Sequence, residues 1–86
     1  YRTMVLTRHL DERAMRLQRA GRIGFTVPNK GVEAVQIGAA AALRSSDWIF
    51  PSYRDFGMAL HHGVPVEHML HGMFCNGLDH SKGRQM

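Results

Sequence analysis

Glycine and proline residues divide this 86-residue chain into short segments, and this division constrains its fold more than any other feature of the sequence. Proline disfavours helix in the residue before it, and glycine commonly ends a helix. Within the segments, apolar side chains recur every three or four positions, which is the spacing of one helix face. The clearest case follows Pro65 and comprises Val66, Met69, Leu70, Met73 and Phe74. The pattern predicts a mainly α-helical chain.

The first two helices are expected in the N-terminal half. One lies within residues 1–22 and is ended by Gly21. Its expected apolar face comprises Leu6, Leu10, Ala14 and Leu17. The other runs from Val32 to Leu43 and is apolar nearly all round, which is typical of a helix buried on more than one side. Its expected main face comprises Val32, Val35, Ala39, Ala42 and Leu43.

Two more helices and one strand are expected in the C-terminal half. Trp48-Ile49-Phe50 is stopped by Pro51 and is too short for a helix, so it predicts a short buried strand. Ser52-Tyr53-Arg54-Asp55 matches a helix-start signature and predicts a third helix that ends at Gly63. Pro65 opens the fourth helix at the position where proline is favoured.

A single strand cannot form a sheet, so its partners are expected elsewhere. The sequence also starts at Tyr1 rather than at a methionine and stops at Met86 within a polar stretch. We therefore expect residues 1–86 to be a single incomplete domain from a longer polypeptide. As it stands, the chain is expected to be mainly α, with about four helices and one short strand.

The net charge of +4 is concentrated in residues 1–22, where six arginines accompany only Asp11 and Glu12. An arginine-rich helix can bind phosphate groups or an acidic partner surface. No helix-turn-helix, zinc-finger or RNA-recognition signature accompanies it. A small basic helical interaction or nucleic-acid-binding module therefore remains an alternative. No apolar run approaches the roughly 18–20 residues of a membrane span, so we expect no membrane association.

Six histidines and one cysteine invite a metal-site interpretation. His68 and His71 share a face of the fourth predicted helix, and Cys75 follows them. Zinc needs three or four ligands held by a second layer of hydrogen bonds. The simpler interpretation places these residues on the polar surface of that helix. We expect no metal ligand and no catalytic residue in the chain, and a single cysteine excludes an internal disulfide.

Tyr53 and Arg54 form the most informative pair, because they lie where the predicted strand gives way to a helix. The free N–H groups of a helix N-terminus attract anions. An arginine in a first helical turn is unfavourable for the helix dipole. A bound phosphate group would give Arg54 a favourable partner. A surface arginine beside a packed tyrosine is an equally good interpretation from these residues alone.

Four blocks of sequence, in this order and spacing, resemble part of one enzyme family. They are Arg19-x-Gly21-Arg22-Ile23-Gly24-Phe25, Gly31-x-Glu33-Ala34, Asp47-Trp48-Ile49-Phe50-Pro51-x-Tyr53-Arg54-Asp55 and Lys82-Gly83-Arg84-Gln85-Met86. The blocks are similar to the α subunit of thiamine-diphosphate-dependent 2-oxo acid dehydrogenases, in particular the branched-chain 2-oxoisovalerate type, with the pyruvate type a near relative. The resemblance implies that the chain is the N-terminal part of an α/β thiamine-diphosphate-binding fold.

The resemblance also implies a cofactor site and a substrate site. Ser52, Tyr53 and Arg54 would contact the diphosphate of thiamine diphosphate. Phe25 and Tyr53 would line the 2-oxo acid pocket, and Met86 would lie at its edge. An apolar wall suits a branched acyl chain, because each buried methylene contributes about 0.8 kcal/mol. Magnesium is expected to take its ligands from outside this chain, since the family's Gly-Asp-Gly…Asn motif does not occur in it.

The implied activity is that of the decarboxylating first component of a 2-oxo acid dehydrogenase complex, which transfers an acyl group to a lipoyl arm. The implied partners are a β subunit, in an α/β heterotetramer, and a lipoyl-bearing acyltransferase. The implied location is cytoplasmic in a prokaryote and the mitochondrial matrix in a eukaryote. Val32 and Ser52 depart from the residues common in the family, and Ser52 stands where the resemblance implies a contact to the diphosphate or the pocket. Alone, the chain is expected to be inactive and to self-associate through its apolar second helix.

Overall fold

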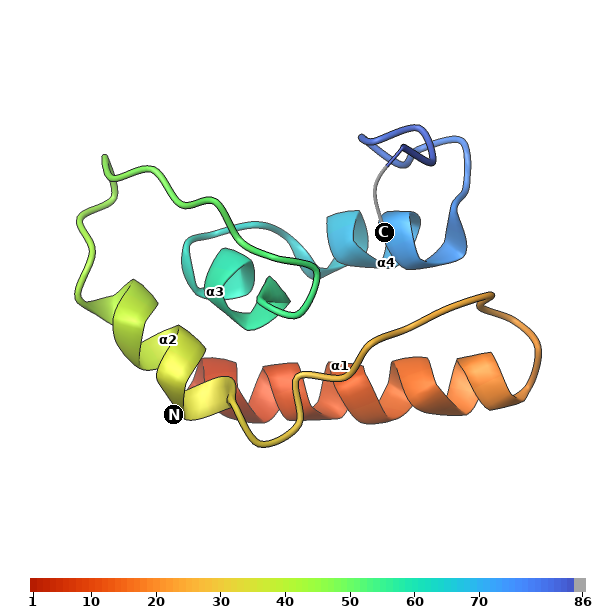
Figure 1. Ribbon diagram of the computed structural model, residues 1–86, viewed down its shortest axis with the longest axis horizontal. Coiled ribbons are helices and arrows are strands. Elements are labelled where there is room, and N and C mark those ends of the chain that lie inside the picture. The colour runs from red at the N-terminus through yellow and green to blue at the C-terminus, as the bar shows by residue number, and fades with distance from the viewer. Residues whose placement is uncertain (85–86) are drawn as a thin grey trace.

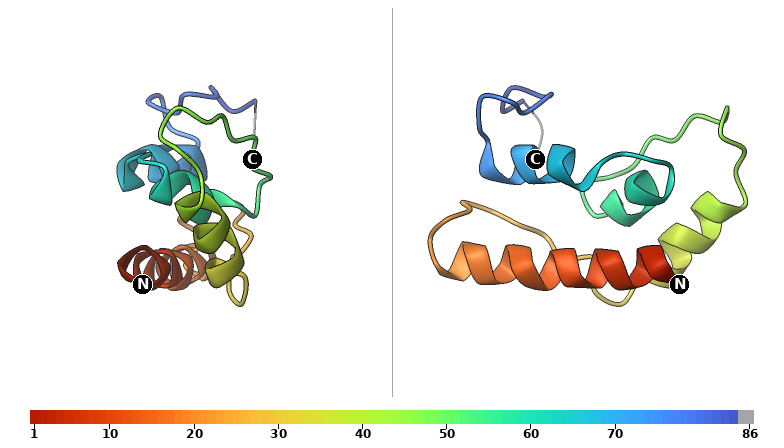
Figure 2. Two further views of the ribbon diagram at one scale, coloured as in Figure 1. Left: turned by 90° about the vertical axis from the view of Figure 1, so that its left-hand side faces the viewer. Right: turned by 180° about the vertical axis from the view of Figure 1, so that it is seen from behind.

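The chain forms four α-helices in a computed structural model that describes residues 1–84. The helices are α1 (Arg2–Arg19), α2 (Glu33–Ala41), α3 (Phe56–His61) and α4 (Val66–Phe74). Figure 1 shows α1 along one side of the molecule, α3 and α4 in a second layer above it, and α2 crossing near the N-terminal end of α1. The same two layers are visible from the side and from behind in Figure 2. The predicted number and order of helices is confirmed.

The hydrophobic core lies between the two layers. Leu10 of α1 is buried together with Phe56 and Leu60 of α3. The residues of α4 that pack against this cluster are Val66, Met69, Leu70 and Met73. The predicted apolar face of the fourth helix is therefore the face that packs, and α4 begins directly after Pro65 as predicted.

The buried face of α1 is not purely apolar. It consists of Thr7, Leu10, Asp11 and Ala14. These residues have helical spacing, but the predicted face contained only Leu10 and Ala14 of them, and Leu6 is exposed. The helix ends at Arg19, shortly before Gly21. The φ of Gly21 is 71°, a left-handed conformation that glycine adopts without the steric cost borne by other residues.

The predicted face of α2 is wrong. Val35 was expected inside, yet its side chain is 74% exposed. The buried residues are instead Glu33, Gln36, Ile37 and Ala40. A polar side chain can be buried at little cost when it finds hydrogen-bond partners there, and both polar residues do so. The helix is also shorter than predicted, since it ends at Ala41 rather than at Leu43.

The predicted buried strand at Trp48-Ile49-Phe50 is also wrong. No strand occurs anywhere in residues 1–84, and this segment belongs to an irregular stretch between α2 and α3. Trp48 is 86% exposed and Phe50 is 91% exposed. A strand needs a neighbouring strand to satisfy its backbone groups, and the described part of the chain provides none.

The helix-start signature forms a turn before α3 rather than its first residues. Asp55 occupies the N-cap position of α3. One oxygen of its carboxylate accepts hydrogen bonds from the Ser52 backbone N–H at 3.0 Å and from the Ser52 hydroxyl at 2.7 Å. The acidic residue thus reaches back to the serine as in a capping box, although the helix begins three residues later than predicted. Arg54 consequently precedes the helix instead of lying in its first turn.

Candidate cofactor and substrate site

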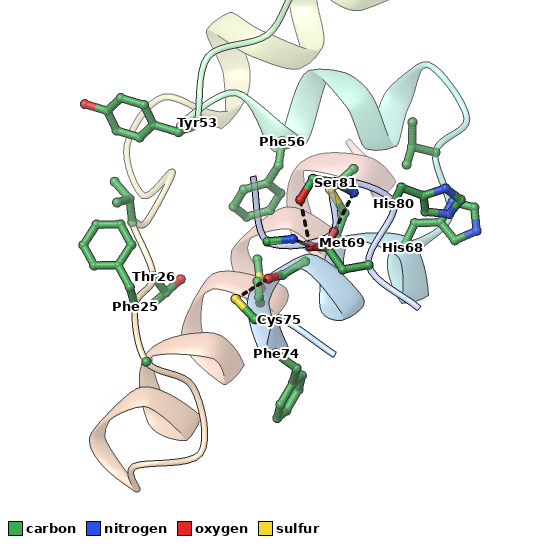
Figure 3. Close-up of a pocket in the computed structure, with 17 residues that line it drawn as sticks. Phe25, Thr26, Tyr53, Phe56, His68, Met69, Phe74, Cys75, His80 and Ser81 are labelled. Atoms are coloured by element: carbon green, nitrogen blue, oxygen red, sulfur yellow. Dashed lines mark hydrogen bonds between the residues drawn. The ribbon is translucent and has the colours of Figure 1, made fainter. Parts of the chain in front are cut away.

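A cavity of about 660 Å³ lies between the connector after α1, the start of α3, the helix α4 and the loop after it. Its lining includes Phe25 from the connector, Phe56 from α3 and Met69 from α4. Figure 3 shows Phe25 and Tyr53 together on one side of this cavity, and His68 and His80 together on the other. The wall is therefore mainly apolar and aromatic, with polar groups at its margin.

The loop after α4 closes one side of the cavity and is organised by Asp79. This buried carboxylate accepts hydrogen bonds from the Gly83 N–H at 2.8 Å, the Ser81 hydroxyl at 2.7 Å and the Ser81 N–H at 3.0 Å. These bonds favour the charged form, so they hold the pKa of Asp79 below its usual value. The ring of His80, in the same loop, packs at 4.3 Å between centroids against His68 of α4.

The two described residues expected to line a substrate pocket share this cavity. Phe25 and Tyr53 lie 28 positions apart in the sequence, and both line it. Both side chains are more than half exposed. Met86, which was expected at the edge of the same pocket, lies outside the described residues. The structure therefore brings two of the three expected residues together.

The three residues expected to bind a diphosphate lie in the turn before α3. The guanidinium carbon of Arg54 lies 5.7 Å from the centre of the Tyr53 ring, within cation–π range. Within residues 1–84, Arg54 has no carboxylate partner. Ser52 differs, because its hydroxyl donates to Asp55 and accepts, at 3.4 Å, from the Arg54 N–H. Its oxygen can turn to a ligand only by giving up these local bonds.

Sequence reasoning missed the residue that ties this turn to the rest of the molecule. The Gln36 side-chain NH₂ donates to the backbone carbonyl of Arg54 at 2.8 Å. Gln36 lies on α2, and its side chain is almost completely buried. A glutamine among the apolar residues that follow Glu33 in this helix is a sequence signal that could have identified it, because an amide buried with them needs a partner.

The metal-site interpretation receives no geometric support. Among residues 1–84, no three histidine, cysteine, aspartate or glutamate side chains are grouped as metal ligands would be. His71 instead bonds to the Asn76 side chain at 2.9 Å, and the Cys75 thiol to the Gly72 carbonyl at 3.4 Å. In the same range, no helix combines the length and the apolar character that crossing a bilayer requires.

Comparison with known proteins supplies the family. The sequence pattern of the dehydrogenase E1 component family matches residues 1–86. The chain is 48% identical, over 80% of its length, to the 3-methyl-2-oxobutanoate dehydrogenase subunit alpha of Mycobacterium tuberculosis. It is 44% identical over its whole length to the 2-oxoisovalerate dehydrogenase subunit alpha of Bacillus subtilis. It is 42% identical, over 99% of its length, to the pyruvate dehydrogenase E1 component subunit alpha of the same organism.

The chain belongs to the dehydrogenase E1 component family. Within that family it matches alpha subunits, of the branched-chain type and of the pyruvate type. The aligned part amounts to 19%, 27% and 22% of these three relatives, so the chain spans about a fifth to a quarter of their length. The expected family is confirmed, and it replaces the alternative of a small basic nucleic-acid-binding module.

Proposed function

We propose that residues 1–86 supply part of the cofactor and substrate site of an E1 α subunit that decarboxylates a branched-chain 2-oxo acid and passes the acyl group to a lipoyl arm. The observation that carries the proposal is the arrangement of Phe25, Tyr53 and Arg54. The two aromatic residues share one cavity, and the guanidinium of Arg54, without a carboxylate partner in the described range, lies 5.7 Å from the centre of the Tyr53 ring.

The residues present fit a diphosphate-bearing cofactor. Arg54 offers a permanently charged guanidinium, whose donors suit phosphate oxygens. When bound, thiamine diphosphate supplies the chemistry that breaks the carbon–carbon bond of a 2-oxo acid. The task of this chain is to hold the diphosphate through Tyr53 and Arg54 and to orient the substrate. Ser52 is the weakest of the proposed contacts, because its hydroxyl already bonds to Asp55.

The cavity wall supports an apolar acyl chain as the group that is recognised. Phe25, Phe56 and Met69 present aromatic and thioether surface, on which each methylene of a branched chain gains about 0.8 kcal/mol by burial. The branched-chain relatives favour the same substrate class, and pyruvate remains the second candidate because a pyruvate-type relative is nearly as similar. Residues beyond this chain are proposed to hold magnesium, and a β subunit and a lipoyl-bearing acyltransferase are the proposed partners.

The test is the variant Arg54→Ala in the full-length α subunit assembled with its β subunit. Loss of a charge-assisted bond to the diphosphate should weaken thiamine diphosphate binding about 10- to 100-fold, measured by titrating activity and by direct binding. Arg19→Ala is the matched control, because Arg19 is an exposed arginine at the end of α1, outside the turn before α3. Unchanged cofactor affinity and turnover in Arg54→Ala would refute the assignment of Arg54.

A further inference from the structure

A chain of buried polar groups runs from α1 to the backbone of Arg54. An Asp11 oxygen accepts from the Asn29 N–H at 2.7 Å, and the Asn29 side-chain NH₂ donates to Gln36 Oε1 at 3.2 Å. The Gln36 NH₂ then donates to the Arg54 carbonyl at 2.8 Å. Asp11, Asn29 and Gln36 are at most 4% exposed. Asn29 and Gln36 therefore link α1 to the turn before α3 through successive buried hydrogen bonds.

The direction of these bonds is fixed by chemistry. A backbone carbonyl can only accept, so Gln36 must turn its NH₂ group towards Arg54. Its carbonyl oxygen is then left to face Asn29, whose NH₂ group must donate to it. Neither amide can be reversed without placing two acceptors or two donors against each other. Gln36 thus holds the Arg54 carbonyl in one place rather than merely contacting it.

The packing around Gln36 leaves its side chain little freedom. A Cβ added to Gly57 of α3 would lie 2.7 Å from Gln36 Oε1 and 3.1 Å from Thr7 Cγ2. Only glycine therefore permits α3 to approach the amide this closely. The Gln36 side chain is enclosed by α1, by α3 and by the turn that it bonds.

This single bond matters because the turn has few other attachments. Residues 42–55 contain no helix or strand. Within residues 1–84, the hydrogen bond from Gln36 is the only one that joins residues 44–54 to any residue outside 44–58. The exposed side chains of Trp48 and Phe50 show that this segment is not held by burial.

We propose that Gln36 is a positioning residue for cofactor binding: it fixes the backbone of the Tyr53-Arg54 turn so that the guanidinium of Arg54 is presented to the diphosphate. This inference rests on the proposed function, since it assumes that Arg54 contacts the cofactor. Gln36 itself is not among the residues that line the cavity. Its effect is therefore expected in cofactor affinity, and only through Arg54.

The experiment uses the full-length α subunit assembled with its β subunit. Gln36→Met keeps the length of the side chain and removes both hydrogen bonds. It should weaken thiamine diphosphate binding about five- to tenfold while turnover at saturating cofactor stays within about twofold of wild type. Gln36→Glu is the second variant: its carboxylate can accept from Asn29 but repels the Arg54 carbonyl, so it should weaken binding at least as much. Gln18→Met, on α1, is the matched control and should bind as wild type does.

Combining Gln36→Met with Arg54→Ala separates positioning from a general structural role. If Gln36 acts through Arg54, the double variant should bind thiamine diphosphate no more weakly than Arg54→Ala alone. Additive losses, or wild-type affinity in both Gln36 variants while Arg54→Ala is impaired, would overturn the inference. Wild-type affinity in Arg54→Ala would instead overturn the proposed function, so the two failures are distinguishable.

Discussion

Replacing Gly57 by alanine tests how far the buried amide of Gln36 fixes α3 against the other helices. The new Cβ would lie 2.7 Å from Gln36 Oε1 and 3.1 Å from Thr7 Cγ2, and one of these groups must move. Thr7 is β-branched and fully buried, so its side chain has little freedom. Gln36 therefore moves, and its bonds to Asn29 and to the Arg54 carbonyl are broken.

The magnitude follows from these two bonds. Each contributes about 1 kcal/mol, and buried groups left without a partner raise the cost by about 1–3 kcal/mol. Alanine gains at most about 1 kcal/mol over glycine from helix propensity, which offsets part of the loss. We therefore expect Gly57→Ala to lower the free energy of unfolding by about 2–4 kcal/mol.

Urea unfolding followed by far-ultraviolet circular dichroism measures this difference. Gly38→Ala is the matched control, because Gly38 also lies in a helix and a Cβ there meets nothing within 4 Å. The control should raise the free energy of unfolding by up to about 1 kcal/mol. Equal gains in stability for both variants would refute the reasoning, since they would show that the amide yields without cost.

Two further predictions concern buried carboxylates with opposite pKa changes. Burial raises the pKa of Asp11 from 3.8 to about 6, so the folded state holds the extra proton between about pH 4 and 6 and stability falls as the pH rises through that window. Asp11→Asn should remove this pH dependence and raise the free energy of unfolding at pH 7 by about 1–2 kcal/mol, after allowance for solvent screening. Urea unfolding at pH 4 and pH 7 measures both effects. The same change in unfolding free energy between the two pH values in the variant and the wild type would contradict the prediction. The hydrogen bond from Arg8 lowers the pKa of Glu33 from 4.5 to about 2, so its contribution is present above pH 4.5 and is lost as the pH falls towards 2. Glu33→Gln should therefore lower the midpoint of thermal unfolding at pH 7 and have little effect at pH 2, and a loss of equal size at both would count against this pairing.

Local sequence features predicted much of the helical framework. Pro65 and the apolar residues after it predicted both the start of α4 and the face that packs, because period and burial agree there. Gly21 correctly marked the end of α1. The blocks around Tyr53 and Arg54 correctly indicated the family, since they are read directly from residue identity and spacing.

The sequence pattern failed where polar residues are buried and where an apolar segment has no partner. It placed Val35 inside and overlooked Gln36, because hydropathy alone does not reveal that a distant carbonyl will satisfy an amide. It predicted a strand at Trp48-Ile49-Phe50, although a strand requires pairing that lies outside local sequence.

The sequence by itself therefore determined which segments are helical, the packing face of the last helix and the family. Only the tertiary structure decided that Phe25 and Tyr53 share one cavity, and that Arg54 is held by an amide 18 positions earlier in the chain. The physical reason is the range of the interactions. Helices form through bonds between residues four apart, whereas a cavity wall and a buried amide depend on contacts between segments that only the folded chain brings together.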